Sequence, residues 1–255
     1  MSIGEIKALL KDISDDDKAA LTKFIDDNID DDRAGVVALV EQAKKRIKKY
    51  DDELIRSEKM LEFEKKYTGQ GFEFICGIDE VGRGPLAGPV VACAVILPKN
   101  EIILGLNDSK QLSKKKREEL YDIILKKAVA YGIGIKSHER IDEINILQAT
   151  FEAMQMAIDN LKVKPDLLLN DAVKIPNVNI HQVPIIKGDT LSASIAAASI
   201  VAKVTRDRMM QEYDNIYPGY DFGSNMGYGS AKHIEGLRNM GPCDIHRRSF
   251  IGNFI

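Results

Sequence analysis

The sequence predicts an α/β protein in which a mixed sheet carries helices on its faces and follows an all-helical segment. The first 70 residues place apolar side chains at helical spacing. The remainder alternates short runs rich in Val, Ile and Phe with longer helical stretches. The Thr68–Gly71 stretch, which contains two glycines, separates the two patterns. We therefore expect a helical extension over residues 1–70 and an α/β domain over residues 71–255.

The extension is expected to contain three helices. A short amphipathic helix should cover about Ile3–Ile13, and Ser14 should cap a second helix that begins with three acidic residues. A long helix is expected from about Arg33 to Tyr67. Its apolar stripe has heptad spacing and consists of Val36, Val40, Ala43, Ile47, Tyr50, Leu54 and Leu61. The stripe can indicate a coiled-coil dimer or packing within the chain, and we favour packing because Ser57 interrupts it.

The elements of the second part follow from the same reasoning. Two strands, Phe72–Ile78 and Pro89–Leu97, are joined by a turn rich in Gly and Pro. Ser113 and Ser230 are expected to cap helices. The remaining expected elements are, in order, helix 113–127, strand 129–135, helix 142–161, strands around 167–169 and 183–186, and helices 191–213 and 230–240.

Composition limits the class of protein. In a chain of 255 residues, 44% are hydrophobic and 29% charged, which is typical of packed domains rather than disordered chains. No apolar run approaches the ~20 residues of a membrane span, and the N-terminus lacks a secretion signal, so we expect a cytoplasmic protein with no membrane contact. Cys76 and Cys93 lie in apolar runs and are expected to be small core residues in a reducing compartment.

The net charge is −3, and the acidic excess lies in residues 1–70. Residues 71–255 are balanced, so charge neither favours nor excludes a nucleic-acid partner.

Acidic residues follow three of the expected strands. Asp79 and Glu80 come after the first apolar run, Asp171 after Leu167–Leu169, and Asp189 after the run that ends at Ile186. Carboxylates gathered without cations repel one another, and Mg²⁺ or Mn²⁺ would relieve the repulsion. Each acid also has a structural explanation, since Asp79 could end a strand in a turn and Asp189 could cap a helix. Spacing alone leaves a metal site open.

The turn Gly82–Gly88 also has two interpretations. Gly82 and Gly84 allow a phosphate or sugar to approach the backbone, with Arg83 as a phosphate partner, or the segment is only a tight hairpin loop. It is not a nucleotide P-loop, because the Gly-Lys-Ser/Thr ending is missing and Pro85 has no N–H.

Several longer motifs of the sequence resemble those of a known family. The segment Gly-Ile-Asp-Glu-Val-Gly-Arg-Gly-Pro-Leu-Ala-Gly-Pro-Val-Val, which starts at Gly77, resembles the opening strand and loop of ribonuclease HII. Further segments resemble the family in the same order, over residues 72–251 in total. They are Asn107–Ser113, Asn170–Ala172, Lys187–Asp189, Ser194–Asp207, Gly227–His233 and His246–Phe250. Asn170 departs from the family, which more often has an aliphatic residue there. Residues 1–70 resemble the helical extension of some bacterial members.

The resemblance implies a ribonuclease H-like fold with a mixed sheet of about five strands. It implies an endonuclease that cuts the RNA strand of RNA–DNA hybrids, including 5′ to a single ribonucleotide embedded in DNA, and leaves 3′-hydroxyl and 5′-phosphate ends. The implied catalytic residues and metal ligands are Asp79, Glu80, Asp171 and Asp189. They would hold two divalent ions, Mg²⁺ or Mn²⁺, about 4 Å apart.

The resemblance also implies how the substrate is chosen. The backbone of Gly82, Arg83 and Gly84 would read the 2′-hydroxyl, and Tyr228 would stack on the next sugar. Further phosphate contacts are expected from Ser109, Lys110, Lys187 and Arg206, although solvated charged side chains are the default for such residues. The expected partners are RNA–DNA hybrids and DNA duplexes that contain ribonucleotides, bound by a monomer.

Two alternatives remain at this stage. A ribonuclease HIII-type enzyme shares the acids and the Gly-Arg-Gly turn but cuts longer RNA tracts, and its N-terminal domain is rich in strands. A non-catalytic hybrid-binding protein would tolerate loss of a carboxylate, yet all four positions are filled. The histidines His138, His181, His233 and His246 have no zinc spacing, and the sequence supports no Ser/His/Asp or Cys/His arrangement.

Overall fold

The computed structural model describes residues 1–255 and divides into two compact units, Met1–Lys59 and Met60–Ile255. Residues 60–70, which we expected to close the helical extension, therefore lie in the second unit. Each unit has its own hydrophobic core.

The first unit is a three-helix structure made of α1 (Ile3–Asp12), α2 (Lys18–Asn28) and α3 (Ala34–Lys59). Its buried side chains come from all three helices and are Ile6, Leu10, Leu21, Phe24, Val36, Leu39, Val40 and Ala43. The start of the heptad stripe thus packs on α1 and α2, which confirms the expectation of packing within the chain. The expected cap of α2 was wrong. Asp17 accepts the hydrogen bond from the Ala20 N–H, whereas the Ser14 hydroxyl turns to Asp16.

The second unit opens with α4 (Glu62–Thr68), so the single helix expected up to Tyr67 is two helices. Met60 and Leu61 lie between α3 and α4, and both side chains are buried in the main core of the second unit.

The sheet is mixed and five-stranded, as the sequence predicted, with the order β3-β2-β1-β4-β5. Its strands are β1 (Ile75–Val81), β2 (Val90–Ile96), β3 (Ala130–Lys136), β4 (Leu167–Asp171) and β5 (His181–Ile185). The first three pair antiparallel, while β4 runs parallel to β1 and β5 parallel to β4. The carboxyl ends of β1, β4 and β5 therefore meet at one edge. The acids do not all follow their strands as expected, because β1 extends through Asp79 and Glu80, and Asp171 is the last residue of β4.

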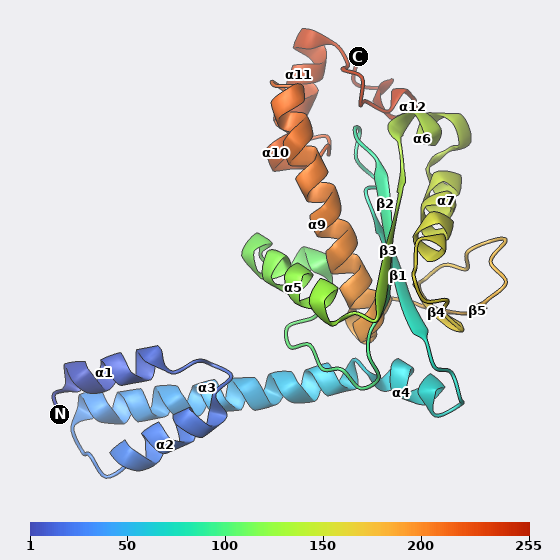
Figure 1. Cartoon of the computed structure of the whole chain (residues 1–255). Helices are drawn as coiled ribbons and strands as arrows, with labels where there is room; N and C mark the ends of the chain where they lie inside the picture. The colour runs from blue at the N-terminus through green and yellow to red at the C-terminus, as the bar shows by residue number, and fades with distance from the viewer. The chain divides into compact units, whose positions relative to one another are not determined.

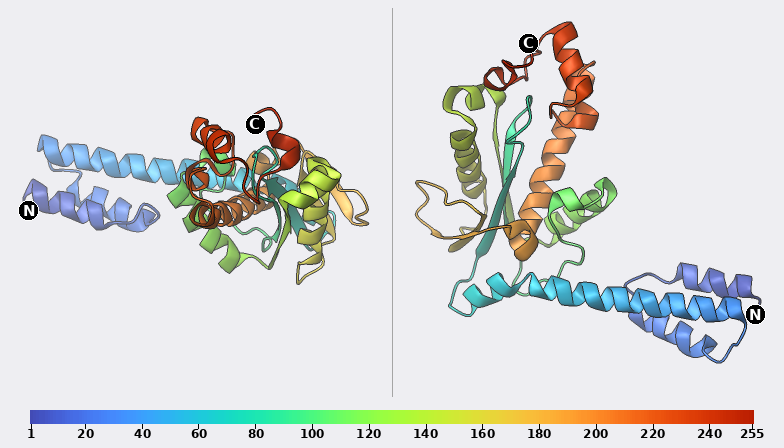
Figure 2. Two further views of the ribbon diagram at one scale, coloured as in Figure 1. Left: turned by 90° about the horizontal axis from the view of Figure 1, so that it is seen from above. Right: turned by 180° about the vertical axis from the view of Figure 1, so that it is seen from behind.

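Helices cover both faces of the sheet (Figure 1). On one side lie α9 (Ala193–Ile216) and α5 (Lys114–Lys127), and on the other α6 (His138–Ile144) and α7 (Ile146–Asp159). The view from behind in Figure 2 shows the same three layers. Gly77 lets α9 approach closely, since a Cβ at that position would lie 2.0 Å from the Ser194 carbonyl carbon. Cys76 and Cys93 are fully buried in these layers, as predicted.

One of the expected helices is interrupted, and another begins two residues later than expected. Asn145 adopts a left-handed φ of 70° between α6 and α7, and its side chain caps α7. Ser192 separates the short α8 (Gly188–Leu191) from α9 and caps α9 through the Ile195 N–H. Asp189 is therefore not the N-cap of the long helix.

The chain ends with α10 (Phe222–Asn225), α11 (Ala231–Met240) and α12 (Arg248–Ile251). Ser113 and Ser230 cap α5 and α11, as predicted. None of the helices combines the length and hydropathy that a membrane crossing requires.

Candidate active site

A cleft of about 780 Å³ lies at the edge of the sheet where the acids gather. Ten of the twelve residues singled out in the sequence line it, namely Asp79, Glu80, Gly82, Arg83, Gly84, Ser109, Lys110, Asp171, Asp189 and Tyr228. Lys187 and Arg206 do not. Residues far apart in the sequence thus meet in one concave site, as expected of a binding site.

The register of the sheet brings Asp79 and Asp171 together. Ile78 pairs with Asn170 in the parallel β1–β4 ladder, so the next residue of each strand occupies adjacent positions. Asp79 points to the same side of β1 as Gly77, which is the side covered by α9. Asp79 is only 7% exposed, and its carboxylate accepts the Glu80 N–H at 2.8 Å.

Asp189 comes to the cleft through a tight connection. Lys187 adopts a left-handed φ of 58° after β5 and starts α8, in which Asp189 is the second residue. The Gly188 N–H donates to the Asp171 carboxylate at 2.8 Å, so this connection is fixed to the end of β4.

The acids destabilise one another's charged forms. Burial, then the charges of Glu80 and Asp171, raise the pKa of Asp79 well above its ordinary value. Burial also raises the pKa of Glu80, although Arg83, whose guanidinium lies 3.2 Å from the carboxylate, opposes the shift. The pKa of Asp189 is raised by burial and by Asp108 and Asp171. Carboxylates in this condition gain from a bound cation.

The donor set suits a hard divalent cation, since it consists of carboxylate oxygens from four residues in one cleft. No three such side chains are already arranged to hold an ion.

The glycine turn is held by two buried arginines. Arg206 donates to the carbonyls of Ala87, Pro89 and Met226 at 2.8–3.1 Å. Arg247 donates to those of Gly82, Arg83, Gly88 and Pro89 at 2.5–3.3 Å. Both side chains are 0% exposed.

The phosphate contact expected from Arg206 is therefore corrected. Its donors are directed at backbone carbonyls beneath the turn, and a Cβ at Gly82 would lie 2.3 Å from its Nε. Lys187 is exposed but lies outside the lining of the cleft.

Tyr228 faces the turn from the loop before α11. Its Cε1 lies 3.5 Å from the position that a Cβ of Gly84 would take, and its side chain is 46% exposed. The Leu86 N–H donates to the Gly227 carbonyl at 2.8 Å, which ties the two segments together.

The cleft also contains residues to which the sequence assigned no role. Ser199 on α9 hydrogen-bonds with Ser109 at 3.0 Å and with Asp79. The hydrogen bond to Asp79 opposes part of the rise in the pKa of that carboxyl. Lys203, one turn further along α9, is held by Asp207 at 2.6 Å. Both lie in the segment that resembles ribonuclease HII. They are four residues apart on one face of α9, and this spacing is the sequence signal that could have placed both of them in the cleft.

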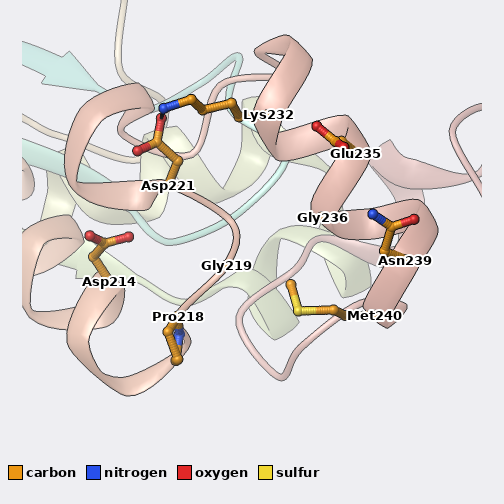
Figure 3. Close-up of a pocket in the computed structure, with 9 residues that line it drawn as sticks. All are labelled: Asp214, Pro218, Gly219, Asp221, Lys232, Glu235, Gly236, Asn239 and Met240. Carbon is orange, nitrogen blue, oxygen red and sulfur yellow. Dashed lines mark ion pairs between the residues drawn. The ribbon is translucent and has the colours of Figure 1, made fainter.

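A second cavity of about 520 Å³ lies between the end of α9 and α11. Figure 3 shows Lys232 of α11 reaching Asp221, an ion pair of 3.9 Å, with Asp214 nearby. None of the residues singled out in the sequence lines this cavity.

Comparison with known proteins agrees with the motifs. The family model described as Ribonuclease HII matches residues 76–253, and the one described as Ribonuclease HII N-terminal domain matches residues 2–68. A ribonuclease HII of Lachnoclostridium phytofermentans is 63% identical over 223 residues, which is 88% of this chain and 87% of that protein.

Solved structures share the fold. The ribonuclease H2 of Pyrococcus horikoshii OT3 superposes with a TM-score of 0.59 at 28% identity and covers 69% of this chain and 93% of that one. Bst-RNase HIII in complex with Mn²⁺ gives 0.50 at 19% identity, covering 66% of this chain and 63% of that one, which indicates the fold alone.

The ribonuclease HIII alternative is thus wrong, because the N-terminal residues are helical and match the other family. The chain belongs to the ribonuclease HII family, whose members are endonucleases that hydrolyse RNA in RNA–DNA hybrids.

Proposed function

We propose that this chain cuts a DNA duplex on the 5′ side of a single embedded ribonucleotide, as well as the RNA strand of longer hybrids, and leaves 3′-hydroxyl and 5′-phosphate ends. The observation that carries the proposal is the convergence of four carboxylates, from β1, β4 and α8, with the Gly82–Gly84 turn and Tyr228 in one cleft.

Asp79, Glu80, Asp171 and Asp189 would hold two divalent cations, Mg²⁺ or Mn²⁺. When bound, these would supply positive charge beside the phosphate and a water of lowered pKa for in-line attack. The raised pKa values of Asp79, Glu80 and Asp189 support this role, because each carboxylate lies near at least one other acid. Cation binding at Glu80 would also release Arg83 to contact a phosphate.

The Gly82–Gly84 turn would read the 2′-hydroxyl through its backbone. Gly84 carries no side chain between the backbone and a nucleotide in the cleft, and Gly82 leaves room for Arg206 beneath the turn. Arg206 and Arg247 support this reading by fixing the carbonyls of the turn from below, so that its outer edge stays in one conformation.

Tyr228 would stack on the deoxyribose that follows the ribonucleotide. Its position opposite Gly84 supports this, because the turn and the ring face the same space. A 2′-hydroxyl on that sugar would interfere with stacking, which favours an RNA-to-DNA junction.

Lys110 and Lys203 line the cleft and are proposed as phosphate contacts, together with the Ser109 hydroxyl. Lys187 is exposed beside α8 and could reach the phosphate backbone outside the cleft. All the proposed groups come from a single chain, so we propose that the protein acts as a monomer.

The test uses a fluorescent DNA duplex with one ribonucleotide, incubated with the full chain in millimolar MgCl₂ or MnCl₂. We expect a single nick 5′ to the ribonucleotide, and loss of at least ~100-fold in kcat with Asp79→Asn, since a missing ligand removes transition-state stabilisation. Asp159→Asn, an exposed acid at the end of α7, is the matched control and should cut normally.

No nick by the wild-type chain with metal present would overturn the proposed function. Full activity of Asp79→Asn would overturn the assignment of the site.

A further inference from the structure

Two histidines lie buried together behind the ribonucleotide-reading side of the cleft. His233 on α11 and His246 before α12 are both 0% exposed, and their Nε2 atoms lie 2.9 Å apart. The rings of Tyr220 and Phe222 pack against both, with centroid distances of 4.9–6.2 Å. Nothing in the proposed cleavage chemistry requires a buried histidine pair at this place.

The contacts at both ends of the pair assign one direction to its hydrogen bonds. His246 Nδ1 lies 3.0 Å from the Cys243 N–H and 3.3 Å from the Cys243 carbonyl, and the shorter contact, with the N–H donor, assigns this nitrogen as an acceptor. The proton of His246 is then on Nε2 and is donated to His233 Nε2. His233 consequently carries its proton on Nδ1, which lies 2.8 Å from the Tyr228 carbonyl. A carbonyl can only accept, so both ends of the chain of hydrogen bonds require the same tautomers.

Both ends of this chain are attached to the reading site. One end is the backbone of Tyr228 itself. At the other, His246 forms a β-bridge with Ala87, and the Arg247 N–H donates to the Leu86 carbonyl at 2.9 Å. The Gly88 N–H donates in turn to the Ile245 carbonyl at 2.9 Å. The histidines therefore connect the segment that carries Tyr228 to the segment that holds the glycine turn.

We infer that His233 and His246 are positioning residues that fix Tyr228 relative to the Gly82–Gly84 turn and so set the preference for a ribonucleotide junction. The inference rests on the proposed function for its effect on substrate choice. The hydrogen bonds of the histidine pair are inferred from geometry alone.

The arrangement requires both rings to be neutral. A second proton on His233 would place two N–H groups face to face, and one on His246 Nδ1 would oppose the Cys243 N–H. Burial, then the neighbouring His233, lower the pKa of His246 to about 4, and burial lowers that of His233. The titratable or charged groups that face the pair are the Cys243 thiol, 3.1 Å from His246 Nδ1, the Tyr220 ring, Arg248, and His138 on α6. None is a carboxylate that would favour a charged imidazole.

The first experiment measures the tautomers without any substrate. The full chain is labelled with ¹⁵N-histidine, and long-range ¹H–¹⁵N spectra are assigned by His233→Gln and His246→Gln, with the exposed His181 as an internal reference. We expect the Nδ1–H tautomer for His233 and the Nε2–H tautomer for His246, both neutral at pH 7. The opposite tautomer, or a charged ring, at either position would overturn the inference.

The second experiment measures substrate choice. We expect His246→Gln to lower kcat/KM on the single-ribonucleotide duplex roughly tenfold more than on a duplex with a continuous RNA strand, as when an orienting hydrogen bond is lost. Adding His246→Gln to Tyr228→Ala should lower the ratio between substrates no further than Tyr228→Ala alone, because both act on the same contact. His181→Gln is the matched control.

An unchanged substrate ratio, or an equal fall on both substrates that follows the melting temperature, would mean that the pair only stabilises the fold. If the wild-type chain fails to cut the single-ribonucleotide duplex, the proposed function falls and takes the claim about substrate choice with it. The tautomers still decide, independently, whether the histidines hold Tyr228.

Discussion

At the scale of the residue, Asp79 shows how the charge of a buried carboxyl group makes the stability of the fold depend on pH. When the folded-state pKa of a carboxyl group is raised above its unfolded value, the contribution of that group to stability is full at low pH and is lost as the pH rises through the folded pKa. Asp79, Glu80 and Asp189 all shift in this direction. Without a divalent cation, the site therefore opposes folding at neutral pH.

We predict that Asp79→Asn melts at a higher temperature than the wild type in EDTA at about pH 8, and that the difference shrinks near pH 5. Millimolar MgCl₂ or MnCl₂ should raise the melting temperature of the wild type by roughly 2–4 °C for each kcal/mol of repulsion that is relieved, and that of Asp79→Asn by less. Differential scanning fluorimetry measures both effects.

His246 acts in the opposite direction. Its pKa falls from the ordinary 6.5 to about 4, so it costs stability as the pH drops through that range. This loss is common to the wild type and Asp79→Asn, which is why the comparison uses their difference. Asp159→Asn should show no metal-dependent change relative to the wild type, and an equal metal response in Asp79→Asn would contradict the prediction.

Individual residues were predictable from the sequence where a local pattern carried the information. An acid that follows an apolar run is visible in the sequence, so Asp79, Asp171 and Asp189 could be named, although Asp79 lies within β1 and Asp189 in α8. Arg206 was misassigned because a sequence does not reveal that a guanidinium is buried under a loop more than a hundred residues away. The roles of His233 and His246 depend on the same kind of distant contact.

At the scale of the element, close approach of α9 to β1 determines where the cleft forms. Gly77 allows the backbones to touch, and α9 then carries Ser199 and Lys203 to the acids. Periodicity could predict α9 but not its start, because the apolar pattern continues through Ser192. The same limitation applies at Asn145, whose left-handed conformation interrupts a helical pattern that has no proline or glycine at the break.

Two glycines of this region are expected to respond differently to alanine. Gly77→Ala places its Cβ 2.0 Å from a backbone atom of α9, so the helix must move and we expect a loss of about 3 kcal/mol or more in the free energy of unfolding. In Gly84→Ala the Cβ meets only Tyr228 Cε1 at 3.5 Å, an ordinary contact, so stability should change by less than about 0.5 kcal/mol. Urea denaturation measures both values.

The effects on cleavage should be in the reverse order when activity is expressed per folded molecule: Gly84→Ala should lose more activity than Gly77→Ala. Gly84→Ala should impair cutting at a ribonucleotide, because its methyl group lies between the turn and the substrate. A stable Gly77→Ala would contradict the packing role of Gly77, and a fully active Gly84→Ala would contradict the proposed contact of Gly84 with the ribonucleotide.

At the scale of the whole molecule, the fold alone does not identify the enzyme type. Structures of a ribonuclease H2 and of a ribonuclease HIII both superpose on this chain. The distinction lies in the sequence, and the N-terminal residues contribute to it because they are helical and match the N-terminal domain of the ribonuclease HII family. The sequence therefore predicted the class of protein better than it predicted the boundaries within it.

The boundary between the parts has a physical basis at the start of α9. The first N–H groups of α9 need acceptors, and two of these acceptors come from Met60 and from Glu64 in α4. The Met60 carbonyl accepts from the Ala193 N–H at 2.9 Å, and Glu64 accepts from the Ser194 N–H at 2.9 Å and from the Ser192 hydroxyl at 2.6 Å. Met60 and Leu61 also fill the core of the second unit.

We therefore propose that the catalytic part begins at Met60, and we predict that a chain of residues 60–255 folds cooperatively and cleaves the single-ribonucleotide duplex. A chain of residues 71–255 should lose several kcal/mol, since each helix-capping contact contributes about 1 kcal/mol and each buried apolar side chain about 2 kcal/mol. Because α9 carries Ser199 and Lys203, fraying of its first turn should also lower kcat. Urea denaturation and cleavage assays on the two chains test this directly. If the two chains are equally stable and active, the boundary lies near residue 70 and α4 is only a linker. If the chain of residues 60–255 fails to fold, residues 1–59 are part of the catalytic fold.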